Sequence, residues 1–324
     1  MNENLPGTEK RYAIGVDIGG TKVAVAVVDA GGVIRHKRKS AVVKDDLSAT
    51  ADQIASLSTQ ALKAASLSWS DVVGAGICIP GIYFAAEGTV WAPNVWGDQR
   101  VQLREALRQR MIADVVLDSD RAAYVTGEQW LGVAQGLSDV VFVAVGTGIG
   151  AGIITGGRLC RGAGDIAGAV GWFALGPRRN QPDKQNGAFE SEASGPAVAR
   201  KVRTRIEAGA ESSLRNVETT AITTELVVRS ALEGDELAKR ILDEAASYLG
   251  MGVANIISIL NPQIVVLGGG LMNAGEYLLE RIRHETQLWA QPMAVKQCRI
   301  ELTGLSDDAG VLGAARLAFL RRNN

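Results

Sequence analysis

The chain has 324 residues, of which 47% are hydrophobic and 21% charged, and its 34 Lys and Arg residues nearly balance 35 Asp and Glu residues. A formal charge of −1 excludes a strong net field for polyanions or anionic lipid, so we expect no nucleic-acid partner and no membrane partner. The longest apolar runs are far shorter than the ~20 residues that span a bilayer. A length above ~250–300 residues predicts two domains.

Cysteine and histidine are scarce and scattered. They are Cys78, Cys160, Cys298, His36 and His284. Separated thiols are typical of a reducing compartment, and residues 1–10 are polar and lack the apolar core of a secretory signal, so we expect a cytoplasmic location. Isolated histidines exclude a close-spaced zinc motif and leave little material for a Ser-His-Asp triad.

Strand and helix patterns alternate along the chain. In the first half, strands are predicted at residues 11–16, 21–29, 33–39, 72–79 and 114–117, and helices at 48–66, 101–111 and 121–131. In the second half, strands are predicted at 139–145, 149–155, 157–160 and 264–267, with the longest helix at 236–260 before Asn261 and Pro262. The same order of elements therefore occurs twice: a strand, a tight turn, two strands, and then alternating helices and strands. This repetition predicts an α/β chain whose two halves share one topology.

Each half opens with a glycine-rich hairpin. The hairpin residues are Gly19, Gly20, Thr21 and Lys22 in the first half, and Gly146, Thr147 and Gly148 in the second. Backbone N–H groups around glycines form anion-binding concavities, so two facing hairpins could hold a polyphosphate. Asp17, just before the first hairpin, could hold Mg²⁺ through water, because hard cations prefer oxygen ligands. The alternative is that both are ordinary tight turns.

The second hairpin also fits a dinucleotide-binding fingerprint, with Gly146, Gly148 and Ala151 in the pattern G-x-G-x-x-A. That fingerprint requires a helix directly after the glycines, because the pyrophosphate binds at the helix N-terminus. Residues 149–155 are apolar and β-branched and predict a strand instead. We therefore favour the hairpin interpretation.

Three segments together resemble the ROK family of bacterial sugar kinases and sugar-responsive repressors, within the actin/hexokinase/Hsp70 superfamily. They are D-I-G-G-T-K at 17–22, residues 146–152, and D-D-A-G-V-L-G-A-A at 307–315. The likeness extends over nearly the whole chain. It implies a two-lobed, actin-like ATPase (ribonuclease H-like) fold with duplicated topology, with residues 1–118 plus 307–324 in one lobe and 119–306 in the other. It also implies ATP and Mg²⁺ as cofactors, a hexose substrate and a homodimer.

Further segments similar to the family imply binding residues. The glycine turn at 74–81, which ends at Gly81, is similar to the family's turn beside the sugar. A-P-N at 92–94 matches the family's A-P-N, whose Asn, here Asn94, bonds a sugar hydroxyl. I-V-V-L-G-G-G at 264–270 looks like the adenosine-binding strand and turn, which implies nucleotide contacts at Gly268, Gly269 and Gly270.

The resemblance also implies the catalytic base. The family has an N-D-A-N segment that runs on to G-E, and counting back from Gly127 and Glu128 places its catalytic Asp at Asp120, which would also contact the sugar. Ser119 and Ala122 replace the two flanking Asn residues. Asp118 is an alternative base, but an acid at the end of a strand is more often simply solvated.

Two segments depart from the family pattern. The sugar-contacting G-E-I-G-H reads G-A-V-G-W at 168–172, and the cysteine-rich zinc loop reads Q-P-D-K-Q-N-G-A at 181–188. Because zinc needs about four N or S ligands, we predict no zinc. Glu190 occupies the position of a family Glu that contacts the sugar. Trp172 either covers the apolar face of a sugar ring or fills the space that the zinc loop leaves.

The predicted activity is the ATP-dependent phosphorylation of a hexose hydroxyl, in the first place glucose to glucose 6-phosphate. Another hexose or an N-acetylated amino sugar is the alternative substrate. A DNA-binding regulator is disfavoured, because only residues 1–10 precede the first predicted strand and the chain is nearly neutral. A sugar-sensing protein without kinase activity stays open, since the departures from the family pattern lie in the sugar and base segments.

Overall fold

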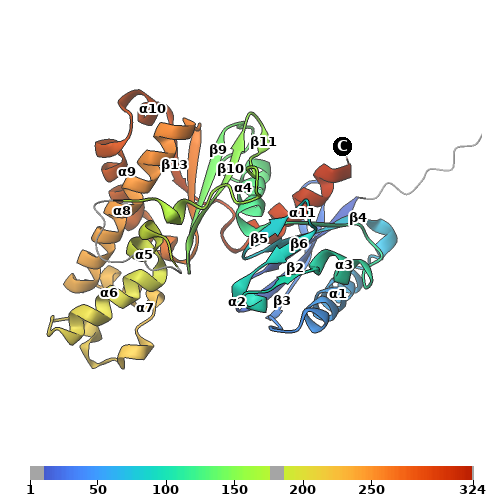
Figure 1. Cartoon of the computed structure of the whole chain (residues 1–324), viewed down its shortest axis with the longest axis horizontal. Coiled ribbons are helices and arrows are strands. Elements are labelled where there is room, and N and C mark those ends of the chain that lie inside the picture. The colour runs from blue at the N-terminus through green and yellow to red at the C-terminus, as the bar shows by residue number, and fades with distance from the viewer. Residues whose placement is uncertain (1–10, 176–185, 323–324) are drawn as a thin grey trace, which may run out of the picture. The chain divides into compact units, whose positions relative to one another are not determined.

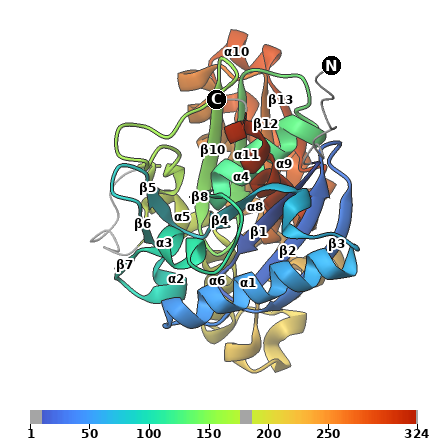
Figure 2. The ribbon, with the colours of Figure 1, turned by 90° about the vertical axis from the view of Figure 1, so that its right-hand side faces the viewer.

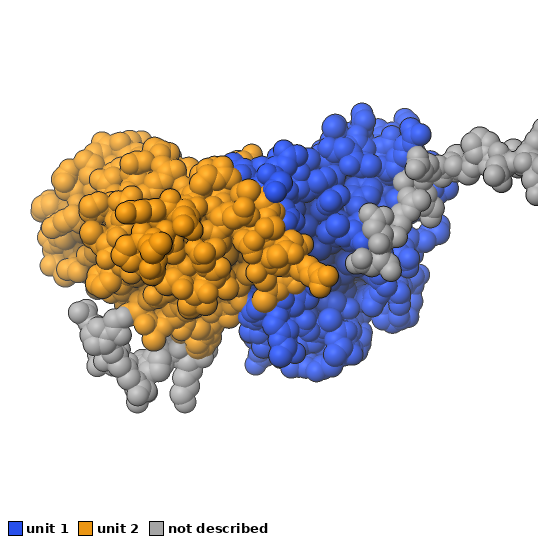
Figure 3. Space-filling model, turned by 90° about the horizontal axis from the view of Figure 1, so that it is seen from above, with its two compact units in different colours: residues 1–136, 161–167, 307–324 blue, residues 137–160, 168–306 orange. Residues whose placement is uncertain are grey.

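The computed structural model describes residues 11–175 and 186–322, which form two compact units (Figure 1, Figure 3). Unit 1 contains the residues up to Gly136, Arg161–Ala167 and the residues from Asp307 on. Unit 2 contains Leu137–Cys160 and Gly168–Ser306. Each unit holds a five-stranded mixed sheet, so the predicted α/β class is confirmed.

The large sheet of unit 1 has the order β3-β2-β1-β4-β8. Strands β1 to β3 pair antiparallel, whereas β4 pairs parallel with both β1 and β8. The strands are β1 (Tyr12–Ile18), β2 (Lys22–Asp29), β3 (Ile34–Ala41), β4 (Val72–Ile79) and β8 (Val115–Ser119). A small antiparallel sheet contains β5 (Ile82–Phe84), β6 (Thr89–Trp91) and β7 (Arg100–Val101).

Helices cover both faces of the large sheet of unit 1 (Figure 1, Figure 2). They are α1 (Leu47–Ala64), α2 (Pro93–Trp96), α3 (Leu103–Arg108), α4 (Asp120–Leu131) and α11 (Ala309–Arg322). Helix α1 packs on β2 and β3, and α11 packs on β1 and β4 with α4 against its side. Residues of α11 (Ala314 and Leu317) thus form a small buried cluster with Cys78 of β4 and Ala123 of α4.

Small residues let α11 lie directly on the strands. A Cβ at Gly15 of β1 would be 1.9 Å from the carbonyl oxygen of Val311, and one at Gly76 of β4 would be 1.8 Å from that of Ala314. The neighbours of Gly15 in the strand, Ile14 and Val16, belong to the hydrophobic cluster on the other face. Because side chains alternate between the two faces of β1, one face packs apolar side chains and the other lets the backbone of α11 approach closely.

Unit 2 repeats the strand order as β11-β10-β9-β12-β13, with the same antiparallel and parallel pairs. The predicted duplication of topology is confirmed. The strands are β9 (Val140–Val145), β10 (Ile149–Thr155), β11 (Arg158–Leu159), β12 (Ile264–Gly268) and β13 (Arg299–Leu302). The helices are α5 (Ala188–Ala193), α6 (Gly195–Glu207), α7 (Thr224–Leu232), α8 (Glu236–Leu260), α9 (Glu276–Trp289) and α10 (Pro292–Gln297).

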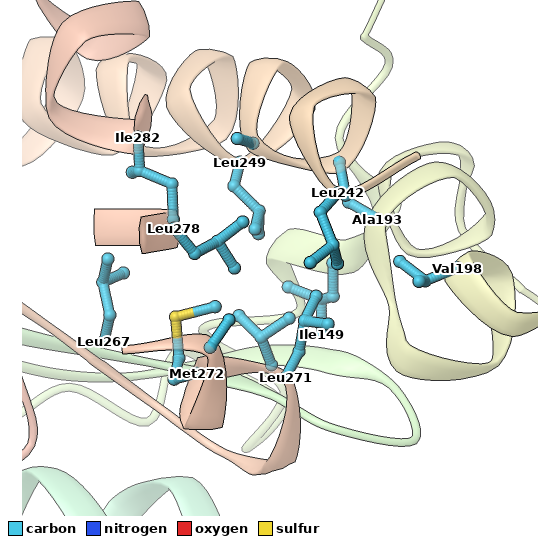
Figure 4. Packing of buried hydrophobic residues seen from close by; sticks show 14 of the residues in the cluster. Ile149, Ala193, Val198, Leu242, Leu249, Leu267, Leu271, Met272, Leu278 and Ile282 are labelled. Atoms are coloured by element: carbon cyan, nitrogen blue, oxygen red, sulfur yellow. The ribbon is translucent and has the colours of Figure 1, made fainter. Parts of the chain in front are cut away.

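Helix α8 has the bounds that the sequence predicts. The Asp235 side chain caps its first turn by accepting from the N–H of Ala238, and Asn261 ends it in the left-handed conformation. Its apolar side chains, such as Leu242 and Leu249, point into the unit 2 core together with Leu278 and Ile282 of α9 (Figure 4).

One predicted helix differs from the structure. The helix predicted at 101–111 is shorter, because Val101 pairs with Val90 in the small sheet and α3 ends at Arg108. The packing groups α4 with unit 1, through its contact with α11. How the chain divides into functional lobes stays a prediction. Among the helices of the described residues, none is long and apolar enough to cross a membrane.

Candidate active site

Asp120 is the first residue of α4, directly after β8. Ser119 caps the helix, because its hydroxyl accepts the N–H of Ala122 at 3.2 Å, and Asp120 Oδ1 accepts the N–H of Arg121 at 2.7 Å. Serine is one of the residues preferred at a helix N-cap, here at the point where β8 ends and α4 begins. Ser119, which departs from the family's Asn, thus supports the start of the helix that bears the predicted base.

The carboxyl group of Asp120 holds a proton more tightly than an ordinary aspartate. Burial, opposed by the Arg121 guanidinium and aided by the negative charge of Asp17, raises its pKa to about 6. A carboxyl group with a pKa near 6 is mostly ionised at neutral pH and is still a better proton acceptor than a solvated aspartate. This is the perturbation expected of a general base.

Asp17 lies near the end of β1, half-buried at the first turn of α11. The thiol of Cys78 in β4 donates to Asp17 Oδ1 at 3.2 Å, and a Cβ at Gly310 would be 2.3 Å from Oδ2. Burial raises the pKa of Asp17, while Cys78 and the ammonium groups of Lys37 and Lys39 oppose that rise. The ionised carboxylate is therefore incompletely compensated by its neighbours.

Lys37 and Lys39 of β3 reach the start of α11. Lys37 pairs with Asp308 and donates to the carbonyl oxygen of Asp307 at 3.2 Å, and Lys39 pairs with Asp307 at 3.3 Å. These ammonium groups are thus shared with acids that precede α11, which explains why they offset the burial of Asp17 only in part.

Asp118, two residues before Asp120, is held by a cation. Its side chain is 8% exposed, and Arg161 donates to Asp118 Oδ2 from Nε at 2.9 Å and from Nη2 at 2.6 Å. Burial raises the pKa of Asp118, and the charge and hydrogen bonds of Arg161 act against that rise. The Oδ1 atom accepts the N–H of Ser119 at 2.9 Å. Both oxygens of Asp118 are engaged in structural contacts.

The first hairpin lies beside Asn94. The N–H of Gly19 donates to the carbonyl oxygen of Lys22 at 2.8 Å and closes the turn between β1 and β2. A Cβ at Gly20 would be 3.5 Å from Cβ of Asn94, which is in the first turn of α2. Gly81 allows the backbone to pass the segment that leads to Asn94, since a Cβ there would be 2.0 Å from the carbonyl oxygen of Trp91.

In unit 2, Glu190 of α5 supports the second hairpin. Its Oε2 accepts the N–H of Ile149 at 2.8 Å, and a Cβ at Gly148 would be 2.6 Å from that oxygen. The hairpin closes through the N–H of Gly146, which donates to the carbonyl oxygen of Gly148 at 2.9 Å. Strand β10 follows the turn, so the dinucleotide-fingerprint alternative, which needs a helix there, is wrong.

The glycine turn after β12 lies against the base of the same hairpin. Gly269 has a φ of +98°, and a Cβ on it would be 2.5 Å from the carbonyl oxygen of Val145, the residue before Gly146. Gly268 ends β12, and Gly270 begins a 3₁₀ turn. The predicted adenosine and phosphate segments of unit 2 are thus adjacent.

Trp172 ends a short 3₁₀ turn and is 60% exposed. This exposure does not fit a side chain that fills space in the interior. The predicted zinc-free loop at 181–188 lies mostly outside the described residues. Among residues 11–175 and 186–322, there is no group of three His, Cys, Asp or Glu side chains placed to hold a metal ion.

The structure thus brings the predicted residues into two sets. Unit 1 holds Asp17, Gly19, Gly20, Thr21, Lys22, Gly81, Asn94 and Asp120, and unit 2 holds Gly146, Thr147, Gly148, Trp172, Glu190, Gly268, Gly269 and Gly270. Sequence reasoning missed Cys78, Tyr124 and Arg161. Burial raises the pKa of Tyr124 far above its usual value, and the charges of Asp17 and Asp120 add to that rise. Cys78 lies in the glycine turn at 74–81 and Tyr124 lies between Asp120 and Gly127, but neither is a position to which those motifs assign a role, and Arg161 lies outside the motifs.

Comparison with known proteins identifies the family of this chain. A sequence model of the ROK family matches residues 13–320. The chain belongs to the ROK family. A glucokinase from Halalkalibacterium halodurans is 30% identical, over 97% of this chain and 97% of its own length. A xylose repressor from Caldicellulosiruptor bescii is 31% identical, over 94% of this chain and 77% of its own length.

A solved ROK structure is also similar over nearly its whole length. A ROK family glucokinase from Streptomyces griseus, crystallised with glucose and AMPPNP, superimposes with a TM-score of 0.81 at 30% identity, covering 95% of this chain and 99% of that chain. The predicted actin-like ROK fold is therefore confirmed. The ROK proteins similar to this chain include both sugar kinases and repressors, so membership of the family leaves the activity to be argued from the site.

Proposed function

We propose that this ROK protein is an ATP-dependent kinase that phosphorylates a hexose hydroxyl, with glucose as the first candidate. The observation that supports it most is Asp120, a half-buried carboxylate with a pKa near 6 whose neighbour Asp118 is occupied by Arg161. The likeness to glucokinases supports the same choice. A cytoplasmic location belongs to this proposal.

In the proposed reaction, the oxygen of the sugar hydroxyl attacks the γ-phosphorus of ATP, and ADP is the leaving group. Asp120 accepts the proton that the hydroxyl loses. Phosphoryl transfer has a loose transition state, so positioning and charge neutralisation do most of the catalysis and a modest base suffices. The N–H of Arg121 fixes one carboxylate oxygen of Asp120 and leaves the other for the substrate.

The two hairpins are the proposed binding sites for the ATP phosphates. Because Gly19 and Gly146 use their N–H groups to close the turns, the candidate donors are the N–H groups of the residues that follow them. These residues are Gly20, Thr21, Thr147 and Gly148, with Lys22 adding a positive charge. The turn at Gly268, Gly269 and Gly270 would bind the adenosine.

Asp17 is the proposed residue for Mg²⁺, held through water. It fits the ion, because its carboxylate oxygens are hard ligands and its charge is incompletely compensated by Cys78, Lys37 and Lys39. Mg²⁺ would neutralise charge on the phosphates. We propose no zinc in this protein, and metal analysis that found one zinc per chain would overturn this part of the proposal.

The sugar contacts that the family motifs imply, and that we propose, are Gly81, Asn94, Asp120, Glu190 and Trp172. Because Glu190 gives Oε2 to Ile149, only its other oxygen would reach a sugar hydroxyl. The indole of Trp172 would cover an apolar face of the ring. With the family's Glu and His replaced here by Ala169 and Trp172, the sugar preference is open to other hexoses and N-acetylated amino sugars.

The experiment is an ADP-release assay with ATP and Mg²⁺ across glucose, mannose, fructose and the N-acetylated amino sugars. We expect turnover with at least one sugar, dependence on Mg²⁺, and loss of turnover in Asp120→Asn. Substituting polyphosphate for ATP tests the donor. Sugar binding without ADP release would favour a sugar sensor that has lost kinase activity, and near-normal turnover of Asp120→Asn would remove Asp120 from the mechanism.

We also propose a homodimer. Apolar side chains at the ends of α8 and α9 and on α10 are exposed, and they are Ile259, Leu288, Trp289 and Met293. Exposed apolar side chains gathered on neighbouring helices are typical of interfaces. Sedimentation equilibrium should give twice the chain mass of 34.1 kDa, and a monomer at micromolar concentration would contradict the proposal.

A further inference from the structure

Arg161–Ala167, here called the strap, packs with unit 1, although the chain directly before and after it belongs to unit 2. The strap is a closed turn. The N–H of Ala167 donates to the carbonyl oxygen of Arg161 at 3.0 Å, and Gly162 and Asp165 both have positive φ angles, +74° and +58°. An Asp in this conformation is uncommon and persists when surrounding contacts hold it.

One end of the strap is fastened beside the proposed base. Arg161 binds the buried carboxylate of Asp118 with two charge-assisted hydrogen bonds, and Asp118 is separated from Asp120 only by the cap residue Ser119. Such bonds to a buried carboxylate are stronger than those of an exposed pair. The guanidinium of Arg161 is 45% exposed, so Asp118 is the more buried partner.

A second contact fastens the middle of the strap. Asp165 Oδ2 accepts the N–H of Ala85 at 2.9 Å, and Ala85 follows β5 in the hairpin that leads on to Asn94 (Figure 2). The strap therefore holds both segments of unit 1 that carry proposed sugar contacts.

The far end of the strap runs directly into the segment that replaces the family's sugar contacts. Gly168 is the next residue, and its carbonyl oxygen accepts the N–H of Ala151 in β10 at 2.7 Å. Four residues later comes Trp172. Residues 168–172 thus follow the strap directly in the chain and are attached to β10 through Gly168.

We propose that the strap positions the acceptor sugar, with Arg161 as the positioning residue that acts through Asp118. This inference rests on the proposed kinase function. Without the pair, the strap would lose its attachment at β8 and would hold only the hairpin that leads on to Asn94. The expected defect is weak binding of the sugar, with binding of ATP preserved.

The test compares Arg161→Ala, Arg161→Lys and Arg161→Ala/Asp118→Asn with a matched control, Arg35→Ala. Arg35 also donates from Nε and Nη2 to one carboxylate oxygen, of Asp29, at 3.0 and 2.6 Å. We measure KM for the sugar, KM for ATP, kcat and thermal unfolding, and we follow amide exchange in peptides that cover residues 161–168.

We expect Arg161→Ala to raise KM for the sugar about tenfold, the usual scale for a lost charge-assisted contact, with KM for ATP within about twofold of the wild type. Amide exchange in the strap should be faster. The rise in KM for the sugar should be smaller in Arg161→Lys than in Arg161→Ala, because lysine keeps the positive charge but not the two-donor geometry of the guanidinium. The double variant should be no worse than Arg161→Ala.

Three results would overturn the positioning role. They are an unchanged KM for the sugar despite faster exchange, equal rises in both KM values, and a defect no larger than in Arg35→Ala. A wild-type protein that phosphorylates no hexose would instead overturn the proposed function, and the positioning role with it. The two failures are distinguishable, because the first is seen in variants of an active enzyme.

Discussion

Replacing Asp120 by Asn should stabilise the protein while abolishing most of its activity. The Asn side chain keeps an oxygen for the N–H of Arg121 but removes the buried charge. A rise of the pKa from the ordinary 3.8 to about 6 means that the folded protein favours the neutral form. That difference corresponds to about 3 kcal/mol of destabilisation when the group is ionised in both states.

The sign follows from the proton balance. Between pH 3.8 and about 6 the folded chain binds more protons at this site than the unfolded chain, so the wild type loses stability as pH rises. We expect Asp120→Asn to be about 3 kcal/mol more stable than the wild type at pH 8, and roughly half as much at pH 5. Its turnover should fall by roughly 10²–10⁴-fold, the range for loss of a general base.

Urea unfolding at several pH values, without ligands, measures this difference. The control is Asp29→Asn. Although burial opposes it, hydrogen bonds from the N–H of Val33 and from Arg35 hold the pKa of Asp29 below its usual range. This variant should therefore lose stability at pH 8, and the loss should shrink as pH falls. An Asp120→Asn protein no more stable than the wild type at pH 8, or with an advantage that does not change with pH, would refute the burial argument.

Three further predictions concern the same site. In the wild type, kcat/KM should rise with pH through a midpoint of about 6, because Asp120 must be ionised to accept a proton; a rate that stays level down to pH 4.5 would contradict this. Gly310→Ala should raise the Mg²⁺ concentration for half-maximal activity several-fold, since the new Cβ would lie 2.3 Å from Asp17 Oδ2. The control is Gly31→Ala, whose new Cβ would have its nearest neighbouring atom at 3.4 Å and should leave that concentration unchanged. Glu190→Ala should raise KM for ATP as well as for the sugar, because the second hairpin loses the acceptor of the Ile149 N–H, and Glu190→Gln should keep KM for ATP near normal; an effect of Glu190→Ala on the sugar alone would exclude the hairpin role.

The duplicated architecture could be predicted because its signals are local. Two glycine hairpins, each between apolar β-branched runs, indicated the antiparallel strands, and the structure has β1–β2 and β9–β10 there. The bounds of α8 followed from its apolar spacing and from Asn261 and Pro262 after its last turn. Each of these features depends on neighbours within a few residues.

The small sheet of unit 1 could not be predicted in the same way. Strands β5, β6 and β7 have three, three and two residues, which is too short for a period-two pattern to be seen. Val101 was consequently assigned to a helix. Its pairing with Val90 depends on the course of the chain between them.

What the sequence determined by itself is the class of fold, the order of the elements and the positions that match the ROK motifs, because periodicity, turn residues and motif spacing are properties of the chain read in order. Tertiary structure alone decided which groups meet: the thiol of Cys78 on Asp17, Arg161 on Asp118, and Glu190 on the hairpin N–H of Ile149. These partners are 61, 43 and 41 residues apart, and only the order of strands in each sheet and the packing of helices on them bring such distant residues within hydrogen-bonding distance. Their burial then sets the pKa values on which the chemistry depends.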